Sequence, residues 1–145
     1  MKPLIGTELK RFLKQYKRNN RTDQRVAALL QSIEYPANVG SIFRMADGAG
    51  MSELYLAGIT PQPPHPTIDK VGRHKSRRVP WRYIDDPVEA AVQAKNDGYH
   101  LVAVELATAA VPYHEFAYPD DVCLVVGHED HGVTKAVLAE CEAAV

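Results

Sequence analysis

Arg44 is the residue of this chain whose type and position most favour a chemical role. It lies within residues 38–50 (NVGSIFRMADGAG), where apolar residues recur at the spacing of a helix that buries one face. A guanidinium stays protonated near neutral pH, so it is a poor general base, but it binds phosphate and stabilises negative charge. A solvated helix face is the alternative interpretation of a lone arginine. Arg44 is therefore the first candidate for a chemical role.

A second polar stretch, residues 127–134 (GHEDHGVT), has the spacing of a phosphate-binding P-loop. However, Val133 stands where the lysine would be, and the acids inside the loop would repel a triphosphate, which excludes a nucleoside triphosphatase. His128 and His131 lack the H-E-x-x-H spacing and have no accompanying cluster of ligands, so we expect no metal site. The dinucleotide fingerprint G-x-G-x-x-G is also missing after the first predicted strand.

Alternating strands and helices must position these residues. Apolar runs predict strands at residues 26–33, 53–57, 79–84, 99–105 and 121–127. Helical spacing and capping signals predict helices at residues 4–16, 38–48, 87–96 and 133–142, with Asn38 and Asp86 as caps of the second and third. Residues 60–66 read as a proline-rich loop. This alternation predicts an α/β fold with a parallel, doubly wound sheet.

Three of the expected loops directly follow predicted strands. Asn38, Leu106 and residues 127–129 each come just after one of them. In a parallel sheet, ligands bind beyond the carboxyl ends of the strands. We therefore expect these loops to gather at one edge of the sheet and to form a site there.

Positive charge is concentrated in two segments, although the net charge of the chain is only −1. Residues 1–25 and 70–82 hold fourteen of the seventeen lysines and arginines, and residues 70–82 contain no acid. Such asymmetry is typical of a surface that binds a phosphate backbone; a pair of solvated segments is the alternative.

Length and composition bound the remaining possibilities. A chain of 145 residues, 46% of them hydrophobic, has the size of one globular domain. Residues 1–6 lack the apolar core of a signal peptide, and no run approaches the roughly 18 apolar residues of a membrane span, so we expect a cytoplasmic protein. Cys123 and Cys141 are interpreted as core thiols without a disulfide. We divide the chain into a basic helix and linker, residues 1–25, and a main domain, residues 26–145.

Two stretches together resemble a known signature. Asn38, Gly40, Ser41, Ile42 and Arg44 stand in the order N-V-G-S-I-x-R, and residues 124–132 (LVVGHEDHG) form a strand that runs into G-x-E-x-x-G. They are similar to the first and second motifs of the SpoU (TrmH-like) RNA methyltransferases of the SPOUT class. The resemblance covers about residues 26–142.

The resemblance implies a fold of the SPOUT (α/β-knot) type and an activity. It implies S-adenosylmethionine as the cofactor, bound in a bent conformation at a deep trefoil knot, and methyl transfer to a ribose 2′-hydroxyl of tRNA or rRNA. It also implies a homodimer whose active sites draw on both subunits. Because the sulfonium makes the methyl group electrophilic, the protein has only to align the reactants and help to deprotonate the hydroxyl.

Individual residues take roles from this resemblance. Arg44, Asn38 and Glu129 match polar motif positions and are the expected catalytic residues; Arg44 would hold the substrate phosphate and stabilise the developing alkoxide. Glu129 would orient Arg44 through a charge-assisted pair, or would tie the two motif loops together. Leu106 and Gly127 fall where the loops of the family wrap the adenosine. The expected RNA contacts are Arg73, His74, Lys75, Arg77 and Arg78.

The chain departs from the family pattern near its C-terminal end. A third motif, a proline-containing segment leading into S-L-N and a final helix, is expected after the second, and the sequence reaches Val145 before it. We therefore expect an incomplete knot, weak cofactor binding and a chain that is part of a longer protein, since a helix ending at residues 143–145 would lack a stop signal. The alternative function is a non-catalytic RNA-binding module on the same scaffold; the presence of Arg44 and Glu129 argues against it.

Overall fold

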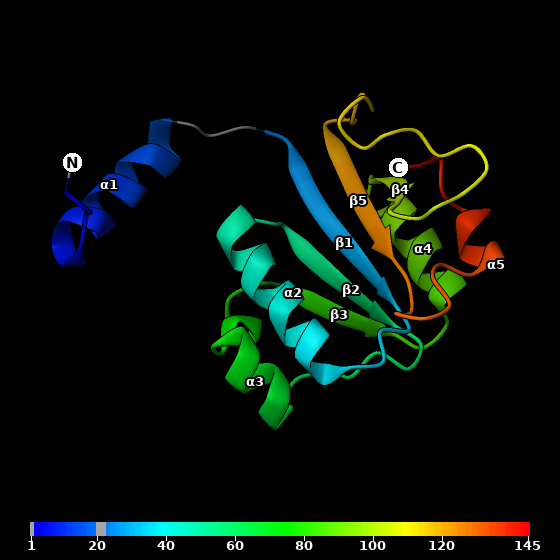
Figure 1. Ribbon diagram of the computed structural model, residues 1–145, viewed down its shortest axis with the longest axis horizontal. Coiled ribbons are helices and arrows are strands. Elements are labelled where there is room, and N and C mark those ends of the chain that lie inside the picture. The colour runs from blue at the N-terminus through cyan, green and yellow to red at the C-terminus, as the bar shows by residue number, and fades with distance from the viewer. Residues whose placement is uncertain (1, 20–22) are drawn as a thin grey trace.

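A six-stranded parallel sheet forms the middle layer of the protein in the computed structural model, which describes residues 2–19 and 23–145 (Figure 1). Its strands are β1 (Arg25–Gln31), β2 (Glu53–Ala57), β3 (Trp81–Ile84), β4 (His100–Ala103), β5 (Asp121–Val126) and β6 (Ala143–Ala144). Their order is β3-β2-β1-β5-β4-β6, and every pairing is parallel. Strands β2 and β3 lie on one side of β1, and β5, β4 and β6 lie on its other side, so the strand order reverses between β1 and β5. The predicted doubly wound α/β fold is confirmed.

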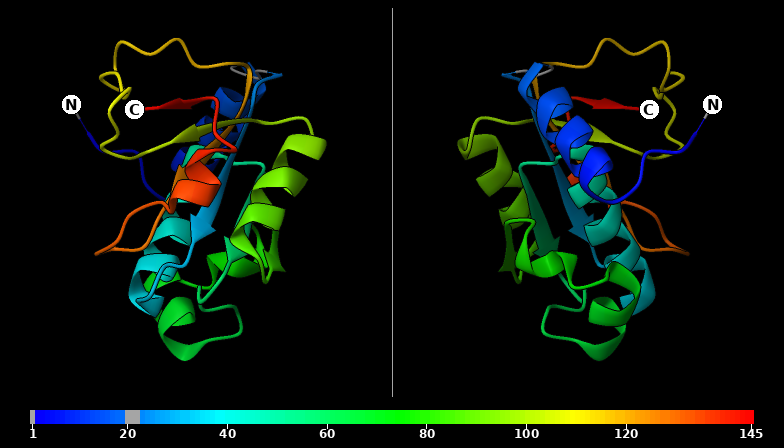
Figure 2. Two further views of the ribbon diagram at one scale, coloured as in Figure 1. Left: turned by 90° about the vertical axis from the view of Figure 1, so that its right-hand side faces the viewer. Right: turned by 90° about the vertical axis from the view of Figure 1, so that its left-hand side faces the viewer.

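Helices cover both faces of this sheet (Figure 2). On one face α2 (Pro36–Ala49) and α3 (Pro66–Gly72) bury residues such as Phe43 and Ile68 against β1, β2 and β3. On the other face α4 (Pro87–Asn96) and α5 (Lys135–Leu138) bury residues such as Ala91 and Val137 against β1, β4 and β5. A short 3-10 helix, η1 (Lys75–Arg77), follows α3. The alternating apolar residues of β1 supply both cores, because successive side chains of a strand point to opposite faces.

Helix α1 (Gly6–Asn19) stands apart from the sheet (Figure 1). The predicted amphipathic helix is confirmed, although it extends to Asn19 and so includes the start of the predicted linker. Residues 20–22 of that linker lie outside the described residues. The apolar side chains Leu9, Phe12, Leu13 and Tyr16 remain between 38% and 55% exposed. Among residues 2–19 and 23–145, none of the helices has the length and apolarity that a bilayer crossing requires.

Helix α2 begins two residues earlier than the sequence predicted. Pro36 occupies the first helical turn, where its fixed φ and missing N–H are tolerated, and Tyr35 is the N-cap without a side-chain hydrogen bond. The prediction that Asn38 caps this helix is therefore wrong. The helix ends at Ala49, because Gly50 adopts a left-handed conformation with φ 71°.

Two further predictions are wrong in part. The supposed loop at residues 60–66 leads into α3, in which Pro66 opens the first turn and the His65 ring accepts a hydrogen bond from the Thr67 N–H. The supposed helix at residues 133–142 ends at Leu138, and Ala143 and Ala144 instead pair with β4 as strand β6. The prediction for α4 is confirmed, including the Asp86 carboxylate that accepts a hydrogen bond from the Val88 N–H at 2.7 Å.

Candidate functional site

The loops after β1, β4 and β5 meet at the carboxyl edge of the sheet, next to the point where the strand order reverses. Two side chains hold the loop after β5 in place. Gln31, only 2% exposed at the end of β1, accepts a hydrogen bond from the Thr134 N–H at 2.8 Å. Glu105, just after β4, accepts one from the Val133 N–H at 2.7 Å. The predicted meeting of these loops is confirmed, and it is the usual place for a ligand in this architecture.

The loop after β5 closes on itself through the backbone. His128 and Gly132 exchange N–H···O bonds of 3.1 and 2.8 Å. A Cβ on Gly127 would overlap the backbone of Gly132 and Val133, and Gly132 itself has a φ of 65°. Both glycines are therefore needed for the shape of this loop. Gly127 lies at the carboxyl edge of the sheet, as predicted. The space left by its missing side chain is taken by Gly132 and Val133 of the same loop.

Glu129 fastens this loop to the start of α2. Its carboxylate accepts hydrogen bonds from the Glu34 N–H at 2.8 Å, the Tyr35 N–H at 3.4 Å and the Asn38 side-chain amide at 2.6 Å. Partial burial acts to raise the pKa of Glu129, but these hydrogen bonds to the ionised form outweigh it and lower the pKa below its ordinary value. A carboxylate at this position also faces the positive end of the helix dipole. Asn38 and Glu129, one from each motif, are thus in direct contact.

Arg44 lies on the other flank of α2. It is exposed, and no hydrogen bond or ion pair engages it within the described parts of the chain. Its neighbours on the helix surface are Gly40, four residues earlier, and Asp47, three residues later. Both of these contact the segment of α3 and η1, since Gly40 approaches the α3 backbone and Asp47 forms an ion pair with Lys75. Of the two roles expected for Glu129, the structure has the tie between the motif loops and not the pairing with Arg44, because backbone N–H groups and Asn38 take the carboxylate.

The predicted basic segment follows α3 and is only partly available to a ligand. Lys75 forms an ion pair with Asp47, Arg78 lies 3.6 Å from the same carboxylate, and the His74 ring lies 3.6 Å from Asp69. Arg73 and Arg77 are exposed, and no ion pair ties either of them to another described residue. The segment thus offers two guanidinium groups without an ion-pair partner among the described residues, and two cations and one histidine that lie beside nearby acids.

Leu106 is the other predicted residue at the carboxyl edge, and it is 98% exposed. Its N–H donates to the Glu105 carboxylate at 3.0 Å, and the second oxygen of that carboxylate accepts from Val133. The loops after β4 and β5 are therefore linked beside Leu106. An apolar side chain held in water forgoes about 2 kcal/mol of burial, so this position suits a surface that a ligand or another segment covers.

A hollow of about 340 Å³ lies beside the contact of Asn38 with Glu129. Its walls come from the loop after β1, from α2 and from the end of β5 and beyond: Ile33, Asn38, Ser41, Ile42, Met45, Val126 and Glu129. Most of these side chains are apolar, and three polar motif residues, Asn38, Ser41 and Glu129, stand among them. Sequence reasoning missed Gln31 and Glu105, the two residues that hold the loop; a polar residue at the end of an apolar strand was the available signal.

Glu34, His128 and Asp130 place possible metal ligands within 4.8 Å of one another. The His128 Nδ1 accepts a hydrogen bond from the Asp130 N–H at 3.1 Å, which puts the ring proton on Nε2, 3.5 Å from the Glu34 carboxylate. Both nitrogens of the His128 ring thus have a neighbour within the chain, the Asp130 N–H and the Glu34 carboxylate.

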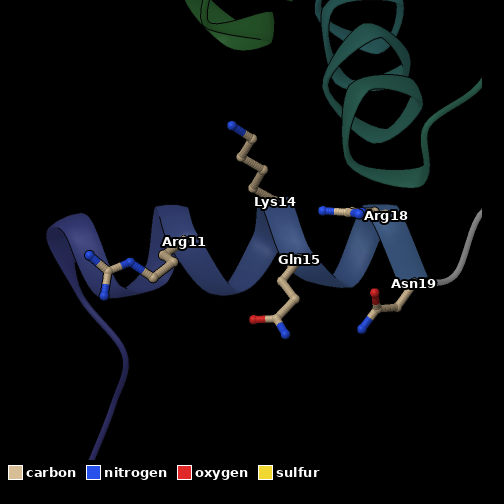
Figure 3. Close-up of a pocket in the computed structure, with 5 residues that line it drawn as sticks. All are labelled: Arg11, Lys14, Gln15, Arg18 and Asn19. Atoms are coloured by element: carbon tan, nitrogen blue, oxygen red, sulfur yellow. The ribbon is translucent and has the colours of Figure 1, made fainter.

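A larger hollow, of about 470 Å³, runs along α1 and not along the sheet edge. It is lined by Arg11, Lys14, Gln15, Arg18 and Asn19. Figure 3 shows that these side chains come from one helix and point in different directions. They do not converge on a common point, so this surface is not a candidate active site.

The parallel sheet and the polar loops gathered where its order reverses define an α/β protein with a candidate ligand site at the carboxyl edge of β1, β4 and β5. Residues 25–145 match the SpoU rRNA Methylase family, and the chain belongs to this family. The family predicted from the two motifs is thereby confirmed.

Known proteins support the same fold. The AdoMet-bound rRNA methyltransferase from Sinorhizobium meliloti is 23% identical and superposes with a TM-score of 0.77 over 88% of this chain and 49% of that one. The SpoU methyltransferase AviRb from Streptomyces viridochromogenes, in complex with AdoMet, is 22% identical, with a TM-score of 0.74 over 89% of this chain and 50% of that one. The tRNA (guanosine(18)-2'-O)-methyltransferase of Escherichia coli strain K12 is 26% identical over 110 residues, 76% of this chain and 47% of the relative. The chain spans about half the length of the curated relatives it matches.

Proposed function

We propose that the protein to which this chain belongs is an S-adenosylmethionine-dependent RNA methyltransferase that modifies a ribose 2′-hydroxyl of tRNA or rRNA. The observation that carries the proposal is the 2.6 Å hydrogen bond between Asn38 and Glu129. It joins the two sequence motifs of the family at the carboxyl edge of the sheet, where this architecture binds ligands. The AdoMet complexes of two structural neighbours support the same cofactor.

The residues at this edge fit part of such a cofactor site. Leu106 offers an exposed apolar surface for an adenine ring, and the linked loops on either side offer backbone N–H and C=O groups. Gly127 contributes indirectly, because it allows the loop after β5 to close. The cofactor, once bound, supplies an electrophilic methyl group on a sulfonium. Leu106 and the loop of residues 127–133 would then orient it at the sheet edge.

The catalytic proposal assigns separate tasks to the polar residues. Glu129 and Asn38 fix the two motif loops to each other and present polar groups to the ribose. Arg44, exposed and without a partner among the described residues, holds the phosphate next to the target ribose and stabilises the alkoxide as it forms. This division is supported by geometry: Glu129 already accepts three hydrogen bonds from the chain, whereas the guanidinium of Arg44 has no hydrogen bond or ion pair among the described residues.

We further propose that the active protein is a homodimer and that Arg44 serves the site of the partner copy. Arg44 is not among the residues that line the hollow beside Asn38 and Glu129, so one copy does not bring all its motif residues together there. A second copy that approaches α2 supplies the missing cation. The exposed Met45 and the half-buried Ile42, which line the hollow beside Asn38, are apolar groups that such a contact would cover.

The RNA backbone is proposed to follow the basic segment of residues 73–78. Arg73 and Arg77 carry most of this role, and His74, Lys75 and Arg78 contribute within their acidic pairs. Neutralising Arg73 and Arg77 together is expected to weaken RNA binding and to lower the slope of log affinity against log salt by about 2. Unchanged affinity and slope would contradict the assignment.

The placement of the protein in the cytoplasm and the division of the chain are proposals as well. Both cysteines are free, which suits a reducing compartment. Residues 1–25 are proposed to form a basic appendage, because α1 stands apart from the sheet, and residues 26–145 the methyltransferase domain (Figure 1).

The central test is calorimetric titration of S-adenosylmethionine and its demethylated product into the 145-residue chain and into the protein with its natural downstream sequence. Binding by the longer form, together with methyl transfer to tRNA or rRNA transcripts, is the expected result. RNA binding without cofactor binding in either form would favour the non-catalytic RNA-binding module instead.

A mixing experiment tests the shared site. Arg44→Ala and Asn38→Ala copies are each expected to be nearly inactive, but randomly paired mixtures should recover about one quarter of the wild-type rate. Half of the dimers are then mixed, and each mixed dimer has one site with both residues intact. No recovery on mixing would place Arg44 and Asn38 in the site of the same copy.

A further inference from the structure

We infer that a third hollow, between α3, η1 and β3, binds an unpaired nucleobase of the RNA. It has a volume of about 230 Å³ and is lined by Pro63, Pro64, Asp69, Ser76, Arg77 and Trp81. The inference rests on the proposed RNA-binding function, and it adds which part of the RNA is recognised and by which groups. None of these residues belongs to the two sequence motifs or to the sheet edge described above.

Trp81 supplies an aromatic wall. It is the first residue of β3 and is half-buried, and its ring meets that of Phe43 edge-on at a centroid distance of 6.4 Å. This packing fixes the indole, while part of it lines the hollow. Bases that are splayed out of an RNA strand stack on aromatic side chains and on guanidinium planes, and Arg77 offers such a plane at the same hollow.

Asp69 determines which chemical group enters. Its Oδ1 atom accepts a weak hydrogen bond from the Ser76 hydroxyl at 3.4 Å and lies 3.6 Å from the His74 ring. A carboxylate only accepts hydrogen bonds, so a ligand beside it must donate. A phosphate would be repelled from this wall. The pairing edge of guanine suits it best, because it offers two adjacent N–H donors, whereas the single N–H of uracil lies between two carbonyl oxygens.

The charges around the hollow favour a nucleotide over other planar ligands. Arg77 lines the hollow beside Asp69, and Arg73 and Arg78 are exposed on the same short segment, so positive charge lies close to the acidic wall. The arginines at the rim attract the phosphate backbone. Inside the hollow the Asp69 carboxylate repels phosphate and accepts hydrogen bonds from a base. The geometry therefore assigns the rim to phosphate and the hollow to the base, with guanine preferred to uracil.

The test uses three labelled five-residue RNAs, UUXUU, in which X is guanosine, uridine or an abasic ribose. Affinity is measured by fluorescence anisotropy of the label at constant salt. The location of the base is measured by quenching of Trp81, the single tryptophan of the chain. We expect the guanosine RNA to bind roughly tenfold more tightly than the abasic RNA and to quench Trp81, since one stacked base contributes that much.

Two variants separate the carboxylate from net charge. Asp69→Asn is expected to reduce the preference for guanosine over uridine to about twofold or less, while the affinity for the abasic RNA changes little. Glu89→Gln makes the same change of charge on the exposed side of α4 and is expected to leave the preference intact. Equal affinity for the guanosine and abasic RNAs, or no quenching of Trp81, would overturn the base site and leave backbone binding in place. No binding of any of the RNAs would overturn both.

Discussion

Replacing Gly40 by alanine tests the packing that presents the motif helix. Gly40 lies where α2 crosses α3, and a Cβ there would lie 3.0 Å from the Ile68 carbonyl oxygen, 3.1 Å from the Gly72 nitrogen and 3.1 Å from the Val71 Cβ. Two of these three atoms belong to the backbone, which cannot rotate away as a long side chain can. The added methyl group must therefore push α3 outward by a few tenths of an ångström.

The magnitude follows from two opposing effects. Alanine in place of glycine inside a helix gains about 0.5–1 kcal/mol, whereas an extra carbon in a filled contact costs about 1–3 kcal/mol. Gly40→Ala is thus expected to lower the free energy of unfolding by about 1 kcal/mol. Gly48→Ala is the matched control, because Gly48 lies in the same helix with nothing within 4 Å of its added Cβ. It should gain about 0.5–1 kcal/mol, so the two variants differ by about 2 kcal/mol.

Urea unfolding of both variants, followed by Trp81 fluorescence and by far-ultraviolet circular dichroism, measures this difference. For a chain of this size it corresponds to roughly 4–8 °C between the two midpoints of thermal unfolding. If Gly40→Ala were as stable as Gly48→Ala, the close crossing of α2 and α3 would not exist in solution.

Three further predictions concern the polar and thiol groups. Glu129→Gln should lower the free energy of unfolding by about 1 kcal/mol at pH 7. Because the folded-state pKa of Glu129 is lowered, this difference should be present above the unfolded pKa of about 4.3 and be lost as the pH falls through the folded-state pKa. A difference that persists in stronger acid would refute it. Burial raises the pKa of Cys141 to about 11 and raises the pKa of Cys123 further. At pH 8 a thiol reagent should therefore modify Cys141 slowly and Cys123 only after unfolding. Rapid reaction of both thiols in the native protein would contradict this. Tyr55→Phe removes the hydroxyl that donates a hydrogen bond to Asp97 at 2.6 Å, away from the carboxyl edge of the sheet. The variant should lose about 1–2 kcal/mol of stability and keep its RNA affinity. Weaker RNA binding by the folded variant would contradict this.

The parts of the fold that local signals specify were predictable. The apolar run of β1 and the sequence Asp86-Pro87 before α4 identify their elements without reference to the rest of the chain. The parallel sheet then follows from the alternation of strands and helices. Helix α3 was missed because four prolines precede or open it, although proline is well tolerated in a first helical turn and His65 provides the cap.

The C-terminal segment was mispredicted because long-range pairing decides its structure. Val137, Leu138 and Cys141 have the spacing of a buried helix face, and the first two do lie in or at the end of α5. Ala143 and Ala144 have little strand propensity, yet they pair with Val102 and Ala103 on the free edge of β4. Unsatisfied backbone groups at that edge, and not the side chains of the alanines, select the strand.

The arrangement of the motif residues was partly calculable from helical geometry. Asn38 and Arg44 are six residues apart, and at about 100° per residue this separation places them about 120° apart around α2. Glu129 can reach Asn38 on one flank, so it cannot also pair with Arg44 on the other. The spacing alone could not predict the partners of Glu129, because two of its three hydrogen-bond donors are backbone N–H groups, which do not depend on the side chain. A substrate that contacts both Asn38 and an Arg44 side chain must therefore wrap around the start of α2 or meet the arginine of a second copy, which is the distinction that the mixed-dimer experiment measures.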